Sequence, residues 1–355
     1  MDNFNWIAFF QVVATVLTSG IIVLWTIPTI NYIARTKGIL NAPGERTSHR
    51  HKTPNLAGIS IFIGMSVSSL LFIHNDLDIF KYVYLASIII FFTGLKDDIL
   101  ILSPWKKLLA QFVVATLIVM ADLRFTHFFG LFGVDEVGEI TSFIITIVFI
   151  VGIINAVNLI DGIDGLVASI GVLILGCFGL FFFINGIYDW AVYCAGMIGA
   201  LIAFFQYNVF GLRNKIFMGD SGSLLLGLCV AVTTIMFWEA NADKSLLLTF
   251  ITAPAITLAI IIVPVYDMTR VFVYRIMRGL SPFSADRNHI HHRIVDMGFT
   301  HFQTSLIILG FNVLIIAVAL TLGLFLGPLW IIAVIVALAF VSVFVMNKIY
   351  EKKKR

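Results

Sequence analysis

Long apolar runs separated by short polar stretches dominate the sequence. A helix of about 20 apolar residues spans the hydrocarbon core of a bilayer, and most of the runs approach that length. The eleven runs are Trp6–Ile30, Leu56–Ile73, Phe80–Leu95, Trp105–Ala121, Ile140–Val157, Leu166–Ile184, Trp190–Phe205, Gly222–Trp238, Leu246–Val265, Thr304–Leu326 and Leu329–Met346. This pattern predicts an all-α polytopic membrane protein with about eleven transmembrane helices.

The composition supports the membrane assignment. Of the 355 residues, 60% are hydrophobic and only 12% are charged, whereas soluble domains carry about 25% charged residues. The first ten residues, "MDNFNWIAFF", lack the basic region of a cleaved signal peptide, so we expect the first run to be retained as a span. Cys177, Cys194 and Cys229 lie inside apolar runs, which favours buried thiols over disulfides.

The basic residues predict how the chain is oriented. Eleven spans place the two termini on opposite sides of the membrane. With the amino terminus outside, every Lys and Arg lies on the inner side except Lys81, Arg124 and Lys244. Because basic residues concentrate in cytoplasmic loops, we expect the carboxyl terminus to be cytoplasmic. The chain is then one integral membrane domain, residues 1–355, ending in a basic tail, residues 348–355.

This topology collects the polar stretches on one side. "TGLKDDI", "NAVNLIDGIDG", "YNVFGLRNKIFMGDSGS" and "SADRNHIHHRI" all fall on the cytoplasmic side. The outer loops are brief, apart from "DLRFTHFFGLFGVDEVGE", which we expect to form a small hairpin. The polar chemistry of the protein is therefore predicted to face the cytoplasm of an inner (plasma) membrane.

Five aspartates belong to these cytoplasmic stretches. A charged side chain at mid-bilayer costs about 2.5–3.5 kcal/mol, and such residues are usually functional. Several carboxylates in one cleft repel each other unless a cation lies among them, and oxygen ligands favour Mg²⁺, with Mn²⁺ as an alternative, over zinc. The five are Asp97, Asp98, Asp161, Asp164 and Asp220.

The glycines beside these aspartates indicate a phosphate or nucleotide site. Asp161 and Asp164 are three residues apart, so on a helix they would share a face. They are also suitable helix N-caps, a purely structural alternative. Gly162 and Gly165 favour the ligand interpretation, because glycine lets a ligand approach the backbone closely. In "FMGDSGS", the aromatic Phe217 has two interpretations, core packing or stacking on a base.

Two basic segments complete the pattern. "HIHHR" contributes His289, His291, His292 and Arg293, whose spacing suits a diphosphate better than a zinc ion. The first inner loop, "NAPGERTSHRHKTPNLAG", is explained by the positive-inside rule alone, but His49 or Lys52 could also add to the anion site.

Together these residues describe a cytoplasm-facing cleft with a divalent cation, glycine-containing turns and a basic loop, surrounded by lipid. Such a cleft suits the joining of a soluble phosphorylated donor to a membrane-embedded acceptor. The rival class is a cation transporter lined by carboxylates. A transporter would distribute acidic residues through the membrane depth, often in broken helices, whereas here they gather on one side.

Four motifs in order, "KDD", "NLIDGIDGL", "FMGDSGS" and "HIHHR", resemble those of the polyprenyl-phosphate N-acetylhexosamine-1-phosphate transferases. The last motif is similar to the branch that transfers GlcNAc-1-phosphate from UDP-GlcNAc to undecaprenyl phosphate and releases UMP. The phospho-MurNAc-pentapeptide translocase branch usually carries three consecutive histidines there. The resemblance implies an enzyme that initiates cell-envelope glycan synthesis, with a UDP-sugar and a polyprenyl phosphate as partners and no nucleic acid. A different UDP-aminosugar and a homodimeric assembly stay open.

The resemblance also implies roles for single residues. Asp220 matches the Mg²⁺ ligand, Asp97 and Asp98 the pair beside the lipid phosphate, with Asp97 often proposed as the base, and Asp161 and Asp164 residues around the nucleotide. A one-step in-line attack and a covalent enzyme intermediate are both compatible with these roles. One departure is Ala57-Gly58, where relatives often carry two glycines. The residues that the resemblance places at the substrates are His49, Lys52, Asn158, Gly162, Asn208, Phe217, His289, His291, His292 and Arg293.

Overall fold

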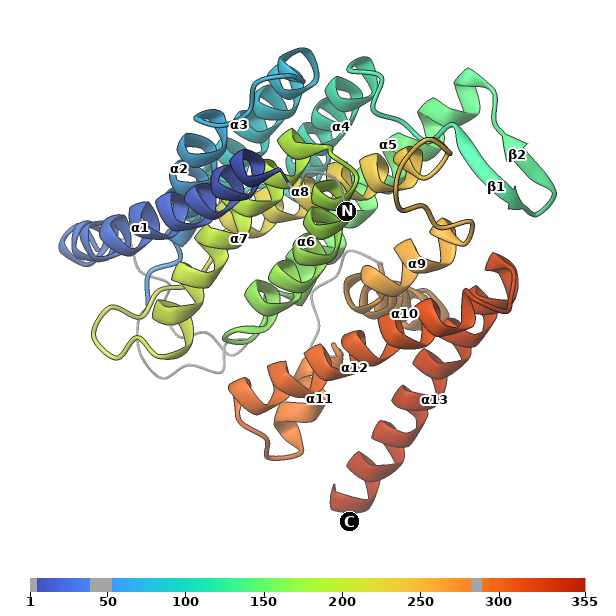
Figure 1. The fold of residues 1–355 in the computed structure, drawn as a ribbon. Helices are drawn as coiled ribbons and strands as arrows, with labels where there is room; N and C mark the ends of the chain where they lie inside the picture. Colours follow the sequence, from blue (N-terminus) through green and yellow to red (C-terminus); the bar gives the residue numbers. More distant parts are fainter. Residues whose placement is uncertain (1–4, 39–52, 282–288, 355) are drawn as a thin grey trace.

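The computed structural model describes residues 5–38, 53–281 and 289–354. Within these ranges the chain forms thirteen α-helices and one two-stranded sheet (Figure 1). This confirms the all-α class for the part of the chain described. The elements are α1 Trp6–Thr36, α2 Ala57–Leu70, α3 Leu77–Leu100, α4 Pro104–Met120, β1 His127–Leu131, β2 Val134–Glu136, α5 Glu139–Ile160, α6 Leu166–Ile184, α7 Tyr188–Val209, α8 Gly219–Ala240, α9 Ala253–Ile260, α10 Ile262–Met277, α11 Ile290–Asp296, α12 His301–Leu322 and α13 Pro328–Lys354.

Eight of the described helices are long and apolar enough to cross a membrane, or nine spans if the bent pair α9 and α10 counts as one. A polytopic membrane protein is therefore confirmed, and each predicted run falls on a helix or on that pair. The number eleven is not confirmed, because α2 has only 14 residues and α4 only 17. Both are short for a straight crossing of about 20 residues.

The run Leu246–Val265 differs most from the prediction of one continuous span. The structure has turns up to Thr252, then the eight-residue α9, and then α10 at an angle of 76° to it. Pro264 lies in the first turn of α10. A proline ring at this position has no N–H and clashes with the carbonyl four residues earlier. A straight helix through residues 253–277 is therefore disfavoured.

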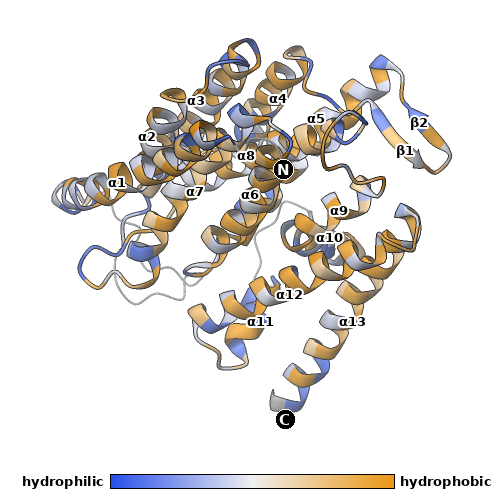
Figure 2. Ribbon diagram, viewed as in Figure 1, coloured by the Kyte–Doolittle hydropathy of each residue, from blue (hydrophilic) through white to orange (hydrophobic). Residues whose placement is uncertain are grey.

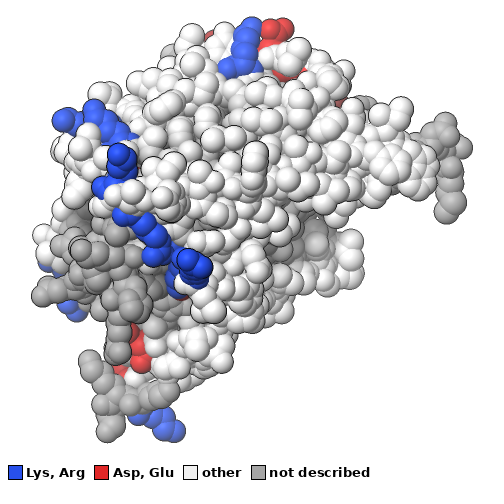
Figure 3. Space-filling model, turned by 90° about the vertical axis from the view of Figure 1, so that its left-hand side faces the viewer, with Lys and Arg blue, Asp and Glu red and all other residues white. Residues whose placement is uncertain are grey.

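The helix at the centre of the bundle is α8. In its apolar window 89% of the residues are buried, compared with 22% for α1 and 17% for α13. A helix that is apolar all round belongs in a protein interior or a membrane. Apolar residues cover the outer helices, and broad areas of the surface carry no Asp, Glu, Lys or Arg (Figures 2 and 3). These outer surfaces suit lipid contact.

The hairpin predicted in "DLRFTHFFGLFGVDEVGE" is confirmed as the antiparallel pair β1 and β2. It is attached to the carboxyl-terminal end of α8. The indole Nε1 of Trp238 donates to the His127 carbonyl at 2.6 Å, and the Thr126 N–H donates to Glu239 Oε1 at 2.8 Å. One end of the central helix is thereby fixed, while the other end carries the polar residues described below.

Two glycines let neighbouring helices contact the amino-terminal end of α8 through backbone atoms. A Cβ atom on Gly94 of α3 would lie 2.5–2.6 Å from backbone atoms of Asp220 and Ser221. A Cβ atom on Gly58 of α2 would meet the Ser221 side chain and the Gly222 backbone. Since backbone cannot rotate away as a side chain does, both positions require glycine.

We expect Gly94→Ala to destabilise the protein by about 1–3 kcal/mol, the usual cost of overpacking a close contact. Gly176→Ala in α6 is the matched control, because a Cβ atom there meets nothing within 4 Å and alanine favours a helix interior. Thermal unfolding in detergent measures both variants. Equal midpoints for the two variants would contradict the close approach of α3 to α8.

Candidate active site

The segment before α2 pairs with the segment before α8. The Phe217 N–H donates to the Pro54 carbonyl at 2.8 Å, the Ala57 N–H to the Phe217 carbonyl at 3.2 Å, and the Gly58 N–H to the Met218 carbonyl at 3.0 Å. Relatives often carry two glycines where this chain has Ala57-Gly58, and the close backbone contact requires glycine at Gly58. Ala57, at the first position, is fully buried. The pairing fixes "FMGD" at the entrance of α8.

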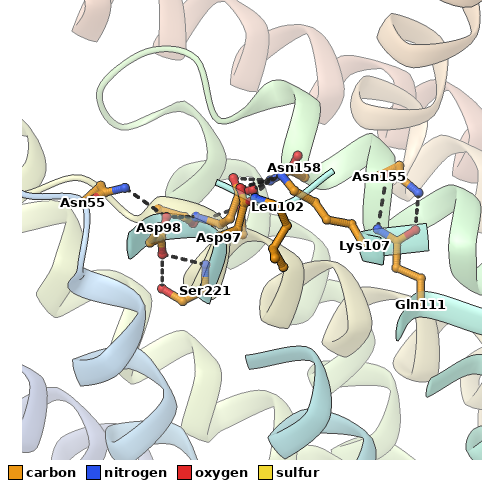
Figure 4. Close-up of polar contacts among 12 residues, drawn as sticks. Asn55, Asp97, Asp98, Leu102, Lys107, Gln111, Asn155, Asn158 and Ser221 are labelled. Atoms are coloured by element: carbon orange, nitrogen blue, oxygen red, sulfur yellow. Dashed lines mark hydrogen bonds and ion pairs between the residues drawn. The ribbon is translucent and has the colours of Figure 1, made fainter. Parts of the chain in front are cut away.

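Asp98, near the end of α3, caps the amino terminus of α8. Its Oδ1 accepts from the Asp220 N–H at 2.8 Å, and its Oδ2 accepts from the Ser221 N–H at 3.0 Å and the Ser221 hydroxyl at 2.7 Å. Asn55 donates to Oδ1 at 3.0 Å (Figure 4). The first N–H groups of a helix have no partner within it, and they favour a negative charge. In the structure this carboxylate is therefore occupied in holding α8.

Asp97 faces a different group. The Lys107 ammonium, in the first turn of α4, lies 2.6 Å from Asp97 Oδ2 and 2.5 Å from Asp220 Oδ2. Asp97 Oδ1 also accepts from the Leu102 N–H at 2.5 Å. The helix dipole disfavours a cation near a helix amino terminus. The two carboxylates therefore supply the negative charge that stabilises the Lys107 ammonium there. Two carboxylates and one ammonium form the charged centre of the site.

Asn158, at the end of α5, completes this centre. Its Nδ2 donates to Asp220 Oδ1 at 3.1 Å and to the Ser223 hydroxyl at 2.8 Å. Figure 4 shows Asp97, Lys107 and Asn158 pointing toward one another from three helices. The structure thus brings together three of the predicted residues, Asp97, Asp220 and Asn158.

The two aspartates of "IDGIDG" have different surroundings. Asp164 is buried and anchors the turn, since its Oδ2 contacts Lys215 at 2.7 Å and His301 at 3.0 Å. For Asp161, burial and the nearby negative charges of Asp220 and Asp98 raise the pKa to about 8. Asp161 therefore adjoins the charged centre, whereas Asp164 binds the turn to the rest of the fold.

Asn208 connects the same turn to the segment before α8. Its Oδ1 accepts from the Gly165 N–H at 2.7 Å, and its Nδ2 donates to the Ile216 carbonyl at 3.1 Å. These contacts use the amide inside the protein. Phe217, predicted to stack on a base, is half-buried, and the Lys215 ammonium lies 5.9 Å from its ring centroid.

The histidine segment lies against the "IDG" turn. His291 is only 2% exposed, and its ring lies against the α-carbon of Gly162, where a side chain would otherwise be. Its Nε2 is buried and has no hydrogen-bond partner in the described structure. His292 lies beside it with ring centroids 4.3 Å apart. His291 is thus close to the predicted nucleotide turn.

The remaining members of that segment are held by α10 and α13. His289 Nδ1 and Asp267 Oδ2 of α10 are 2.7 Å apart, and the Ile290 N–H donates to Asp267 Oδ1 at 2.9 Å. Arg293 donates to Asn347 of α13. His49 and Lys52 lie outside the described residues.

Two functional candidates escaped the sequence analysis. In the sequence Lys107 is explained by the positive-inside rule alone, but the helix dipole disfavours a cation in the first turn of a helix, which is consistent with nearby carboxylates. Asp267 lies three residues after Pro264 and two residues beyond the apolar run Leu246–Val265, and a carboxylate so close to an apolar run is itself a functional signal.

The residues present fit a hard divalent cation. No group of three or more His, Cys, Asp or Glu in the described parts of the chain is arranged to hold a metal ion. However, carboxylate oxygens of Asp97 and Asp220 both contact one cationic atom, the Lys107 nitrogen. Mg²⁺ commonly takes one or two protein carboxylates and completes its shell with water and substrate phosphate. The ammonium thus marks a position where a cation is stabilised.

The fold and the site define a polytopic membrane protein with an acidic, cation-stabilising centre at a helix terminus. A profile of the family described as "Glycosyl transferase family 4" matches residues 80–238. The chain is 31% identical over 310 residues to the undecaprenyl-phosphate α-N-acetylglucosaminyl 1-phosphate transferase of Salmonella typhi, covering 85% of this chain and 82% of the relative. The proteins of the same name from Yersinia pestis and Haemophilus influenzae are 29% and 28% identical, covering 73% and 81% of their lengths. The chain belongs to the family of undecaprenyl-phosphate α-N-acetylglucosaminyl 1-phosphate transferases.

The buried His291 predicts a pH dependence of stability. Burial lowers its pKa to about 3, whereas the unfolded value is about 6.5. Protonation therefore favours the unfolded chain: this contribution to stability is present above pH 6.5 and is lost as the pH falls toward 3. The loss is about 2 kcal/mol at pH 5.

Thermal unfolding between pH 7.5 and pH 5 measures this effect. We expect His291→Gln to lose less stability across that range than the unsubstituted protein. His74→Gln, at an exposed histidine, is the control variant and should keep the pH slope of the unsubstituted protein. An identical pH slope in the unsubstituted protein and His291→Gln would contradict the assignment.

Proposed function

We propose that this protein transfers GlcNAc-1-phosphate from UDP-GlcNAc to undecaprenyl phosphate, releasing UMP and forming a lipid-linked diphosphate sugar. The named activity of its relatives supports the sugar phosphate and the acceptor. The structural observation that carries the proposal is the shared contact of Asp97, Asp220 and Lys107. A charge-compensated centre of this kind suits phosphoryl transfer, in which catalysis is mainly positioning and electrostatic stabilisation.

Asp220 and Asp97 are the proposed ligands of Mg²⁺, with Mn²⁺ as an alternative, and the Asn158 amide lies beside them. When bound, the ion would neutralise charge on the donor diphosphate. Lys107 would then be released from the carboxylates to bind a phosphate oxygen. The partly buried ammonium retains a strong attraction for that anion, because the local dielectric is lower than in water.

The chain's main task is to bring two anions together. A phosphate monoester has a second pKa of about 6, so the acceptor is mostly doubly ionised near neutral pH. In the proposed reaction its oxygen attacks the β-phosphorus of the donor in line, and the bond to UMP breaks. Because the acceptor is already ionised, it needs no strong base, and Asp97 serves the cation. Arg293 adds positive charge at the diphosphate, and His291 and His292 offer it ring N–H groups.

A covalent alternative makes an aspartate the nucleophile and forms a sugar-phosphoryl enzyme. It requires exchange of labelled UMP into UDP-GlcNAc in the absence of lipid. We propose the one-step reaction because Asp98, in the structure, has hydrogen-bond partners on both oxygens and Asp97 is bound to Lys107.

An apolar cavity of about 360 Å³ provides room for the part of the acceptor chain next to its phosphate. It lies between the ends of α5 and α6 and the helices α10 to α13, and His291 and Asp267 are among its lining residues. An isoprenoid tail gains from burial against such a surface, and its phosphate would then be at the polar end. We also propose the finer topology predicted above: eleven membrane segments, an outer amino terminus and a site that faces the cytoplasm of the plasma membrane.

Purified protein given UDP-GlcNAc, undecaprenyl phosphate and Mg²⁺ is expected to release UMP. Asp220→Asn should lower the rate by about 10²-fold or more, because it removes charge that stabilises the reacting phosphates. The matched control is Asp78→Asn, since Asp78 is exposed and forms a surface ion pair with Lys81. UMP release that needs neither lipid nor metal, or that survives in Asp220→Asn, would refute the proposal. Turnover only with another UDP-aminosugar would change the donor.

Lys107→Met tests whether Mg²⁺ binds between Asp97 and Asp220, with a measurement that does not depend on enzyme activity. The variant leaves Asp97 and Asp220 facing each other without the ammonium, so we expect a lower unfolding temperature in chelator and a larger Mg²⁺-induced rise than in the unsubstituted protein. Lys106→Met is the control, because Lys106 is exposed and adjacent in sequence. Equal Mg²⁺ responses in both variants would place the ion elsewhere.

A further inference from the structure

A pair of amide side chains joins α4 to α5 inside the bundle. Asn155 Nδ2 donates to Gln111 Oε1 at 2.7 Å, and Gln111 Nε2 donates to Asn155 Oδ1 at 3.2 Å. Gln111 is only 1% exposed. Among the described residues, neither side chain hydrogen-bonds to the carboxylates of the site, and the function proposed above gives them no role. Two amides that satisfy each other in an apolar interior are costly to separate.

The pair lies one helical turn from the charged centre on both helices (Figure 4). Gln111 follows Lys107 by four residues, and Asn155 precedes Asn158 by three, so each pair shares one helix face. Lys107 and Asn158 both contact Asp220. The helices α4 and α5 are thus connected at two levels, directly through the Gln111–Asn155 amide pair and, one turn away, through Asp220, which contacts both Lys107 and Asn158.

We infer that the Gln111–Asn155 pair is a positioning element that sets how α4 lies along α5 and thereby keeps the Lys107 ammonium between Asp97 and Asp220. The other buried residues of α4 are Val114, Ala115, Ile118 and Val119. Apolar contacts are non-directional, so they tolerate small shifts. Reciprocal amide hydrogen bonds are directional and hold one register.

The consequence for the site follows from helix geometry. A slip of one residue moves α4 by about 1.5 Å along its axis and turns it by about 100°. Lys107 has a long, flexible side chain, and its nitrogen lies within 2.6 Å of two carboxylates. A fixed backbone position for Lys107 is therefore required for both contacts to form together.

The test variant is Gln111→Met/Asn155→Leu, which replaces both amides with apolar groups of similar shape. Removing both partners preserves folding better than removing one, since no buried amide is left unpaired. A water-soluble carbodiimide condenses Lys107 with a touching carboxylate, and peptide mass spectrometry measures the yield of Lys107–Asp97 and Lys107–Asp220 cross-links. The measurement uses the full chain in detergent with chelator, and its unfolding temperature is recorded alongside.

We expect the cross-link yield to fall by about fivefold or more in this variant, because a displacement of about 1 Å already disrupts reactive alignment. The swapped variant Gln111→Asn/Asn155→Gln keeps an amide pair and should recover most of the yield. Thr116→Val is the control on α4, since its hydroxyl donates to the Phe112 carbonyl of the same helix in an exposed hydrogen bond. A yield within about twofold of the unsubstituted protein in the folded Met/Leu variant would overturn the inference.

The catalytic readout rests on the proposed function and is kept separate. UMP release by the Met/Leu variant should show a lower kcat with a smaller change in KM for UDP-GlcNAc, and the swap should restore kcat. Because cross-linking requires no turnover, the two claims fail differently. A protein that cross-links as expected but releases no UMP would refute the proposed function alone.

Discussion

The structure depends on satisfying the amino terminus of one buried helix. The first N–H groups of α8 have no partner inside the helix, and such groups cost about 1–3 kcal/mol each when they are buried without a hydrogen-bond partner. Asp98 accepts from two of these N–H groups and from the Ser221 hydroxyl. The segments before α2 and α8 pair beside it, and Gly94 and Gly58 bring their helices into backbone contact. The location of Asp220 follows from this arrangement.

Once Asp220 is fixed there, its charge has to be compensated. Asp97 adds a second carboxylate, and Lys107 bridges the two. The same balance explains the proposed chemistry, because a centre that holds one cation between two carboxylates can exchange it for a cation that arrives with a diphosphate. Asp164 and Asn208 act one layer further out, where they hold the "IDGIDG" turn against α12 and the segment before α8.

The sequence predicted the membrane class, the hairpin of β1 and β2, and the convergence of Asp97, Asp220 and Asn158. Polar side chains at the ends of apolar helices are stabilised where they share one polar site. The sequence did not predict the different contacts of Asp97 and Asp98. These adjacent residues point in different directions from α3, Asp98 toward α8 and Asp97 toward Lys107 of α4. Lys107 was indistinguishable from a topological charge, because its partner Asp220 is 113 residues away. The sequence also did not predict the 76° bend between α9 and α10, although Pro264 in the first turn of α10 disfavours a straight helix there.

The position of the metal ion tests the account most directly. Crystals of the protein with Mn²⁺ and UDP-GlcNAc, measured at the manganese absorption edge, would locate the ion by its anomalous signal. The account predicts one strong peak in contact with carboxylate oxygens of Asp220 and Asp97, with the Lys107 ammonium moved onto a donor phosphate oxygen. A peak held instead by His289, His291 and His292, with Lys107 still bridging the two aspartates, would contradict it.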